Sequence, residues 1–126
     1  MKKFNKKKLP SRHTTIGADK APQRSFYYAM DLTEKDVAKP FVGVVSTWNE
    51  AAPCNINLMK QAQSVKKGVQ ATGGTPREFC TITVTDGIAM GHEGMKSSLI
   101  SRDVIADSTE LTVRGHCYDA LVGLAG

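Results

Sequence analysis

Two short sequence motifs carry side chains suited to holding a ligand or a metal ion. Cys54 follows Pro53 in a loop-like segment, and Asp86 is followed at once by Gly87, which lets backbone pass close to whatever the carboxylate holds. A thiolate is a soft donor and a carboxylate a hard one, so the two suit different cations. Spacing alone also allows plainer roles: Asp-Gly is a common turn pair, and Pro53-Cys54 can be a helix start with a buried thiol.

Each motif follows a run of residues that predicts a strand. Residues 41–46 are almost continuously apolar, and residues 78–84 and 119–126 are also rich in apolar side chains. Residues 55–72 predict a helix with an apolar stripe, and residues 102–117 predict a second one. This order indicates an α/β fold, in which a parallel sheet carries crossover helices in a βαβαβ arrangement.

That arrangement predicts where the chemistry lies. In open parallel sheets ligands bind outside the carboxyl ends of the strands, so Cys54 and Asp86 are expected on one rim of the sheet. A short helix over 21–30 and a helical turn opened by Thr33 are expected before the sheet, and Ser101 is expected to cap the last helix. Five residues are expected to face inward from that helix: Val104, Ile105, Ser108, Leu111 and Thr112.

The three cysteines are too few and too widely spaced for a disulfide framework. Cys80 and Cys117 lie in strand-like and helix-like runs and are expected to be buried thiols. Cys54 is expected near a helix N-terminus, where the thiolate is favoured. His92 is a candidate zinc ligand or a base for a nucleophilic Cys54, but no zinc site is completed at short spacing. A loop-shaping role is the preferred interpretation for His92 and Glu93.

The positive charge is concentrated at the start of the chain. Six of the 17 Lys and Arg residues fall in the first twelve positions, leaving 11 basic against 12 acidic groups in the rest. Residues 1–18 are therefore predicted to be a mobile basic tail and irregular lead-in, with a polyanion-binding arm as the alternative. No signal peptide or membrane-length apolar run is visible, which favours a cytoplasmic protein with no membrane partner and no nucleic-acid-binding face.

Residues 11–126 resemble the N-terminal part of the dihydroxy-acid and phosphogluconate dehydratases. The resemblance rests on six words in order: Ala21-Pro22-x-Arg24, Ser46-x-Trp48-Asn49-Glu50-x-x-Pro53-Cys54-Asn55, Thr72-Gly73-Gly74-x-Pro76, Val84-x-Asp86-Gly87-Ile88-x-Met90-Gly91-His92-Glu93-Gly94-Met95, Ser98-Leu99-x-Ser101-Arg102-x-x-Ile105-Ala106-Asp107-Ser108 and His116-Cys117-x-Asp119-Ala120-Leu121-Val122. It implies that residues 19–126 are the incomplete N-terminal portion of a larger catalytic domain, and that the chain is truncated.

The resemblance also implies the chemistry. Cys54 would be a ligand of an iron–sulfur cluster, with the 2Fe–2S type favoured over 4Fe–4S, and Asp86 would bind Mg2+. The full enzyme would be a hydro-lyase of branched-chain amino-acid biosynthesis, turning a 2,3-dihydroxy acid into a 2-keto acid as a homodimer or larger assembly. The alternatives are a sugar-acid or phosphogluconate dehydratase fragment, or a non-enzymatic polyanion-binding remnant. No catalytic residue is assigned to this chain, which is expected to be inactive alone.

Overall fold

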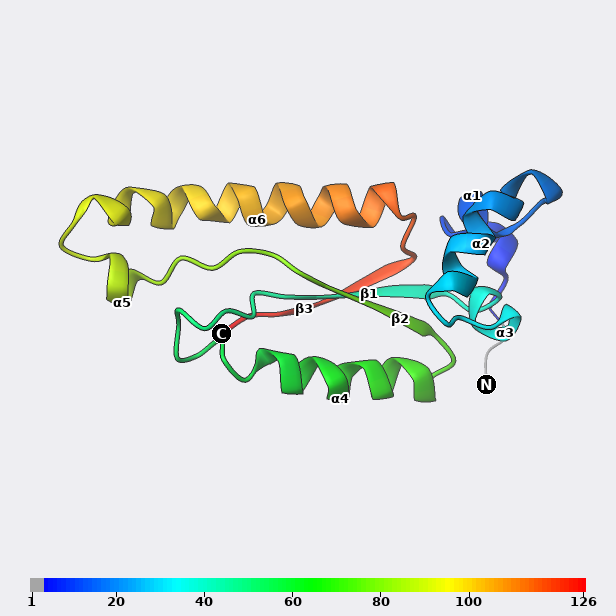
Figure 1. The fold of residues 1–126 in the computed structure, drawn as a ribbon, viewed down its shortest axis with the longest axis horizontal. Helices are drawn as coiled ribbons and strands as arrows, with labels where there is room; N and C mark the ends of the chain where they lie inside the picture. Colours follow the sequence, from blue (N-terminus) through cyan, green and yellow to red (C-terminus); the bar gives the residue numbers. More distant parts are fainter. Residues whose placement is uncertain (1–3) are drawn as a thin grey trace.

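The computed structural model describes residues 4–126, which fold around a three-stranded parallel sheet (Figure 1). Its strands are β1 (Phe41–Ser46), β2 (Thr75–Cys80) and β3 (Ala120–Leu124), in the order β2-β1-β3. Both neighbours run parallel to β1, which is the central strand and is almost wholly buried. The predicted α/β fold with a parallel βαβαβ sheet is confirmed.

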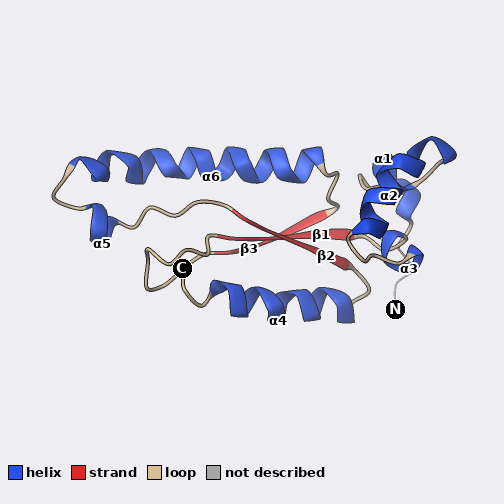
Figure 2. Ribbon diagram, viewed as in Figure 1, coloured by secondary structure: helices blue, strands red, loops and turns tan. Residues whose placement is uncertain are grey.

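The two long helices lie on opposite faces of the sheet (Figure 2). Helix α4 (Leu58–Ala71) lies along one face and packs on β1 and β2, whereas α6 (Lys96–Gly115) runs along the other. The predicted apolar stripe of α4 is confirmed, because Leu58 and Ala62 are buried and Val65 and Val69 are half-buried. The core therefore lies between α4 and β1, where Val44 is also fully buried. Phe41 is fully buried as well, but against Tyr27 and Lys6 of the N-terminal segment.

Strand β2 begins and ends earlier than the predicted strand over 78–84. It starts at Thr75 and includes Pro76, which has no N–H but is tolerated because β2 is an edge strand. The last rung is the bond from Thr81 N to Ser46 O (3.0 Å), where β1 also ends. Beyond that rung β2 has no neighbour to pair with. Asp86 is consequently not at a strand end, but opens the short helix α5 (Asp86–Ala89).

Helix α6 begins at Lys96, before the predicted start at residue 102. Ser101 is therefore not its cap but lies inside the helix, buried, with its hydroxyl donating to Ser98 O. Two of the residues expected to face inward do not: Val104 and Leu111 are 45% and 71% exposed. The other three, Ile105, Ser108 and Thr112, are half-buried as expected, and the Ser108 and Thr81 hydroxyls form a hydrogen bond (2.8 Å).

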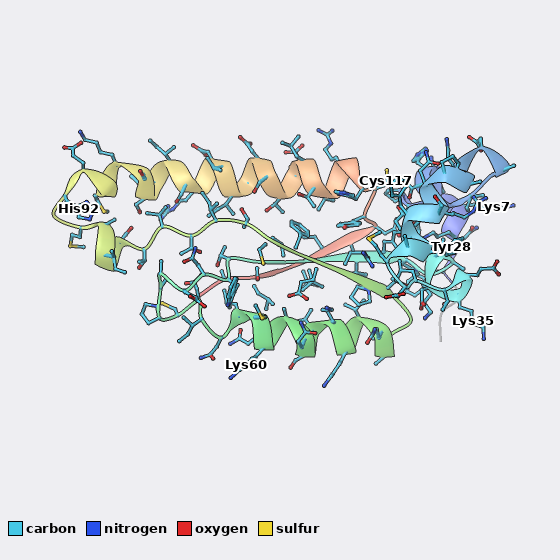
Figure 3. All side chains as sticks on the ribbon, in the orientation of Figure 1. Lys7, Tyr28, Lys35, Lys60, His92 and Cys117 are labelled. Atoms are coloured by element: carbon cyan, nitrogen blue, oxygen red, sulfur yellow. The ribbon has the colours of Figure 1, made fainter. Side chains whose placement is uncertain are left out.

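Three parts of the chain that were expected to be buried are partly or fully exposed. The apolar run over 119–126 suits a buried strand, but β3 is an edge strand with Leu121 42% exposed. Cys80 ends the other edge strand and is exposed rather than buried. Cys117 is only half-buried and sits just after α6, at a left-handed φ of 52° (Figure 3).

Short helical segments precede the sheet and gather at the amino ends of the strands (Figure 1). They are the 3-10 turns η1 (Lys6–Lys8) and η2 (Ala18–Lys20) and the helices α1 (Arg12–Thr15), α2 (Ala21–Ala29) and α3 (Glu34–Val37). The predicted helix over 21–30 is confirmed as α2. The predicted turn is confirmed as α3, which Thr33 and Asp36 open with a reciprocal capping box.

The expected mobile tail is wrong for residues 4–18, while Lys2 and Lys3 lie outside the described residues. Ser11 is fully buried, because Asp119 accepts bonds from its backbone N–H (2.8 Å) and hydroxyl (2.6 Å). The same carboxylate accepts a bond from Phe41 N at 2.8 Å. Lys6 donates to Lys39 O (2.6 Å) and stacks 4.1 Å from the centre of the Phe41 ring. The N-terminal segment is thus attached to the sheet.

Within residues 4–126 no helix is both long and apolar enough to cross a lipid bilayer.

Candidate ligand cleft at the carboxyl ends of the strands

The segments that follow β1, β2 and β3 meet in one cleft of about 340 Å³. Cys54 comes from the segment after β1, Asp86 from the segment after β2, and Gly126 from the end of β3. The expectation that Cys54 and Asp86 share one rim of the sheet is therefore confirmed. Asp86 reaches the rim although its strand ends early, because the segment from Thr83 to Thr85 extends along the cleft wall.

Asn55 fixes the position of the neighbouring Cys54. Its side chain is 4% exposed, and its Nδ2 donates to Thr47 O (2.7 Å), Thr47 Oγ1 (2.7 Å) and Thr83 Oγ1 (3.0 Å). Thr47 follows β1 and Thr83 follows β2, so one buried amide ties both strand exits to the Cys54 loop. The Cys54 thiol itself is exposed at the cleft.

The helix start predicted beside Cys54 is not there. Residues 51–57 form turns, and α4 begins only at Leu58, so Cys54 is not in its first turn. The reason is that the Asn55 side chain hydrogen-bonds to Thr47 and Thr83 and therefore does not cap a helix. Asn57 takes the cap position without a side-chain cap bond. The geometry therefore presents Cys54 from a loop.

Gly126 packs directly against the Cys54 loop. A Cβ atom at residue 126 would lie 2.8 Å from Cys54 O and 2.9 Å from Asn55 Oδ1, distances that real Cβ atoms do not reach. Only glycine therefore lets the backbone after β3 approach the thiol-bearing loop so closely.

Asp86 is held by a residue from the other side of the cleft. Ser98 lies in the first turn of α6, is 8% exposed, and donates its hydroxyl to Asp86 Oδ1. Within residues 4–126 no side chain donates to Asp86 Oδ2, and the carboxylate is exposed to the cleft. One oxygen thus positions the group while the other is available to a ligand.

His92 shapes the loop between α5 and α6, as the sequence favoured. Its Nδ1 accepts a bond from Gly94 N (3.0 Å), so the proton lies on Nε2, which donates to Ile88 O (2.9 Å). Both ring nitrogens are therefore engaged, and His92 is not the base of a Cys54 dyad. Glu93 forms an exposed ion pair with Lys96. Figure 3 shows His92 at the tip of this loop.

The Cys54 thiol and the Asp86 carboxylate suit two different cations, but they do not complete the coordination shell of either. A thiol and a carboxylate in one cleft match a soft and a hard metal respectively. In the part of the chain that the structure describes, however, no three His, Cys, Asp or Glu side chains gather where a metal would need them. Further ligands would have to come from elsewhere.

Sequence reasoning missed the supports of this cleft. Asn55, Ser98 and Arg102 all line it, but the sequence assigned none of them a role in a ligand site. The spacing of Ser98 and Arg102, four residues apart, would have put both on one helix face. This spacing could not be used, because the helix was expected to begin at residue 102 and Ser98 was placed in the loop before it.

The fold and the cleft define an α/β protein with a mixed thiol and carboxylate site at the carboxyl ends of its strands. The family model described as "Dihydroxy-acid/6-phosphogluconate dehydratase N-terminal" matches residues 39–126. The chain belongs to this family, and the resemblance stated from the sequence is confirmed.

Three curated relatives illustrate the match. The chain is 90% identical over its whole length to a dihydroxy-acid dehydratase of Pelagibacter ubique, and it spans 22% of that protein. It is 78% identical over 99% of its length to that of Parvibaculum lavamentivorans (22% of the relative), and 56% identical over 87% to that of Metallosphaera sedula (20%). The chain thus spans about a fifth of the length of these relatives.

Proposed function

We propose that this chain contributes the N-terminal part of a dehydratase that removes water from a 2,3-dihydroxy acid and yields a 2-keto acid. The observation that carries the proposal is the cleft where Cys54 and Asp86 meet, within a chain 90% identical to a dihydroxy-acid dehydratase. The names of the relatives favour a dihydroxy-acid dehydratase over a sugar-acid dehydratase. We take the acid to be one of branched-chain amino-acid biosynthesis, as the resemblance in the sequence implies.

In this proposal Cys54 holds an iron–sulfur cluster of the 2Fe–2S type and Asp86 holds Mg2+. When bound, the two groups would supply Lewis acidity for loss of the C3 hydroxyl and for loss of the C2 proton. Asn55 keeps the thiolate at the rim, and Ser98 holds one oxygen of Asp86 so that the other faces the cleft. The remaining metal ligands and the base that takes the proton would come from outside this chain.

The competing polyanion-binding function is less well supported by the contacts of the basic segment. Lys6 is occupied by Lys39 O and the Phe41 ring, and only Lys7 and Lys8 of the described Lys run are exposed. Within residues 4–126 this run thus offers two exposed lysines for phosphate contacts, and phosphate contacts provide most of non-specific affinity. The charge of Lys6 is better explained as part of the docked segment.

A chimera tests the proposed function. The first 126 residues of this chain replace the matching segment of the Pelagibacter ubique dihydroxy-acid dehydratase, and dehydration of 2,3-dihydroxyisovalerate, iron and magnesium are measured. We expect turnover in the chimera and none in the 126-residue chain. Cys54→Ser should remove iron, Asp86→Asn should weaken magnesium binding, and both should abolish turnover.

Cys80→Ser is the matched control, because Cys80 is also an exposed thiol but does not line the cleft. It should keep both metals and full turnover. Normal iron content and turnover in Cys54→Ser would refute the assignment of Cys54, and turnover by the isolated chain would refute the division of the site.

A further inference from the structure

Two segments carry the donors of the cleft, and side chains join them to each other. We define the thiol arm as residues 47–57, which follow β1 and include Cys54, and the carboxylate arm as residues 81–86, which follow β2 and end at Asp86. Within residues 4–126 the last backbone rung between the two strand exits is the bond from Thr81 N to Ser46 O. Beyond that rung the Thr83 hydroxyl renews the contact, so the arms stay together up to the cleft.

Three polar groups close a ring of hydrogen bonds at this contact. Asn55 Nδ2 donates to Thr47 O (2.7 Å) and to Thr83 Oγ1 (3.0 Å), and Thr83 Oγ1 donates to the same Thr47 O (2.8 Å). Each group is therefore bonded to the other two. A hydroxyl fits at residue 83 because it both donates and accepts, and a purely apolar side chain of the same shape would open the ring.

The ring holds the carboxylate arm at one end, and Ser98 holds it at the other. Asn55 is 4% exposed, so its amide cannot exchange these bonds for water without opening of the loop. Asp86 lies three residues after Thr83, and its Oδ1 accepts a bond from the Ser98 hydroxyl. Ser98 thus fixes the carboxylate group, whereas Asn55 and Thr83 fix the backbone that carries it.

We propose that Asn55 and Thr83 form a bridge that sets the position of Asp86 relative to Cys54, so that cation binding at Asp86 depends on a side chain of the thiol arm. The inference rests on the proposed function for the identity of the cations, whereas the bridge itself rests on the hydrogen bonds. The dependence runs in both directions, because the same bonds hold the Cys54 loop against the carboxylate arm. Both are positioning residues, since their bonds are to protein groups.

The first test uses the 126-residue chain without metals and measures backbone order parameters of the carboxylate arm by NMR relaxation. We expect the Val84 and Thr85 amides to be rigid in the wild type, at about 0.85, and to fall below about 0.6 in Asn55→Ala. Thr83→Val should have the same effect, and Thr83→Ser should keep the arm rigid because it keeps the hydroxyl. Unchanged amide shifts in β1 and α6 would show that a variant is folded.

Thr81→Val is the matched control for the loss of a threonine hydroxyl from the carboxylate arm. The Thr81 hydroxyl bonds to Ser108 Oγ on α6 (2.8 Å) and is not part of the ring. This variant should therefore leave the order parameters of Val84 and Thr85 at their wild-type values.

The second test measures metal binding in the chimera, with each substitution placed in the arm opposite to the metal that is followed. Mn2+ serves as the probe of the Asp86 site, because a carboxylate suits Mn2+ as it suits Mg2+, and free Mn2+ is measured by electron paramagnetic resonance. Asn55→Ala should weaken Mn2+ binding roughly tenfold, and Thr83→Val should speed the release of iron to a chelator by a similar factor. Thr83→Ser and Thr81→Val should match the wild-type chimera in both measurements.

Order parameters at Val84 and Thr85 that stay at wild-type values in both Asn55→Ala and Thr83→Val would overturn the inference. So would an unchanged Mn2+ affinity in Asn55→Ala in a chimera that binds both metals. The outcomes are separable from those of the proposed function. A carboxylate arm loosened in the 126-residue variants, alongside a chimera without metals or turnover, would refute the proposed function alone. An active chimera with a rigid arm in both variants would refute the inference alone.

Discussion

Asp119 is expected to be the most costly polar side chain to remove from this fold. Its carboxylate accepts three hydrogen bonds, from Ser11 N, Ser11 Oγ and Phe41 N, at 2.6–2.8 Å. Ser11 and Phe41 are both 0% exposed, so water cannot replace the lost acceptor. The three bonds join residues that are 108 and 78 positions apart in the sequence.

The magnitude follows from the donors that Asp119→Ala would leave behind. The Ser11 hydroxyl can turn to another acceptor, but the two buried N–H groups cannot, and each such orphan costs about 1–3 kcal/mol. We therefore expect the free energy of unfolding to fall by about 4 kcal/mol, a large part of the roughly 5–15 kcal/mol typical of a domain. Asp119→Asn keeps one carbonyl oxygen and should lose about half as much.

Urea unfolding followed by circular dichroism and by the fluorescence of Trp48, the single tryptophan, measures this loss. Hydrogen exchange at the Ser11 and Phe41 amides should accelerate in the same variant. Asp103→Ala is the control, because Asp103 is exposed on α6 and should change stability by less than about 0.5 kcal/mol. The reasoning is refuted if Asp119→Ala unfolds at the wild-type urea midpoint or leaves both exchange rates unchanged.

Two further perturbations test the N-terminal dock and the end of α6. Burial lowers the pKa of Lys6 from 10.5 to about 8, against the attraction of Asp119, so the unfolded chain binds more protons between these values. The free energy of unfolding should therefore rise with pH across that window, and urea midpoints from about pH 7 to about pH 9.5 should show the rise in wild type but not in Lys6→Met. Cys117 holds a left-handed φ of 52° at the C-terminal turn of α6, so Cys117→Gly should raise the free energy of unfolding by about 1 kcal/mol. Cys117→Ala keeps the Cβ atom and should not; equal thermal midpoints for the two variants would contradict the strain argument.

Local patterns in the sequence determined the parts of the fold that short-range physics controls. The strand β1, the apolar stripe from Leu58 to Val69 and the helical turn opened by Thr33 all formed as expected. The same patterns placed Cys54 and Asp86 on one rim, because parallel strands bring their carboxyl ends together. The six family words required no structure at all.

Only the tertiary structure decided which strands lie at the edges of the sheet. The order β2-β1-β3 exposes Cys80 and Leu121, although both lie in runs that would suit a buried strand. Periodicity describes a segment and not its neighbours, so it cannot distinguish a central strand from an edge strand. Long-range pairing likewise decided that Ser11 docks on Asp119, since no local signal links residues 108 positions apart.

The division is clearest within the cleft itself. The sequence by itself determined which residues can bind metals, because thiol and carboxylate chemistry belongs to the residue type. The tertiary structure decided which side chains of the cleft are held and by what: Asn55 bonds to both strand exits, and Ser98 bonds to Asp86. A side chain's availability depends on the neighbours that folding brings to it, and those neighbours come from segments far apart in the chain.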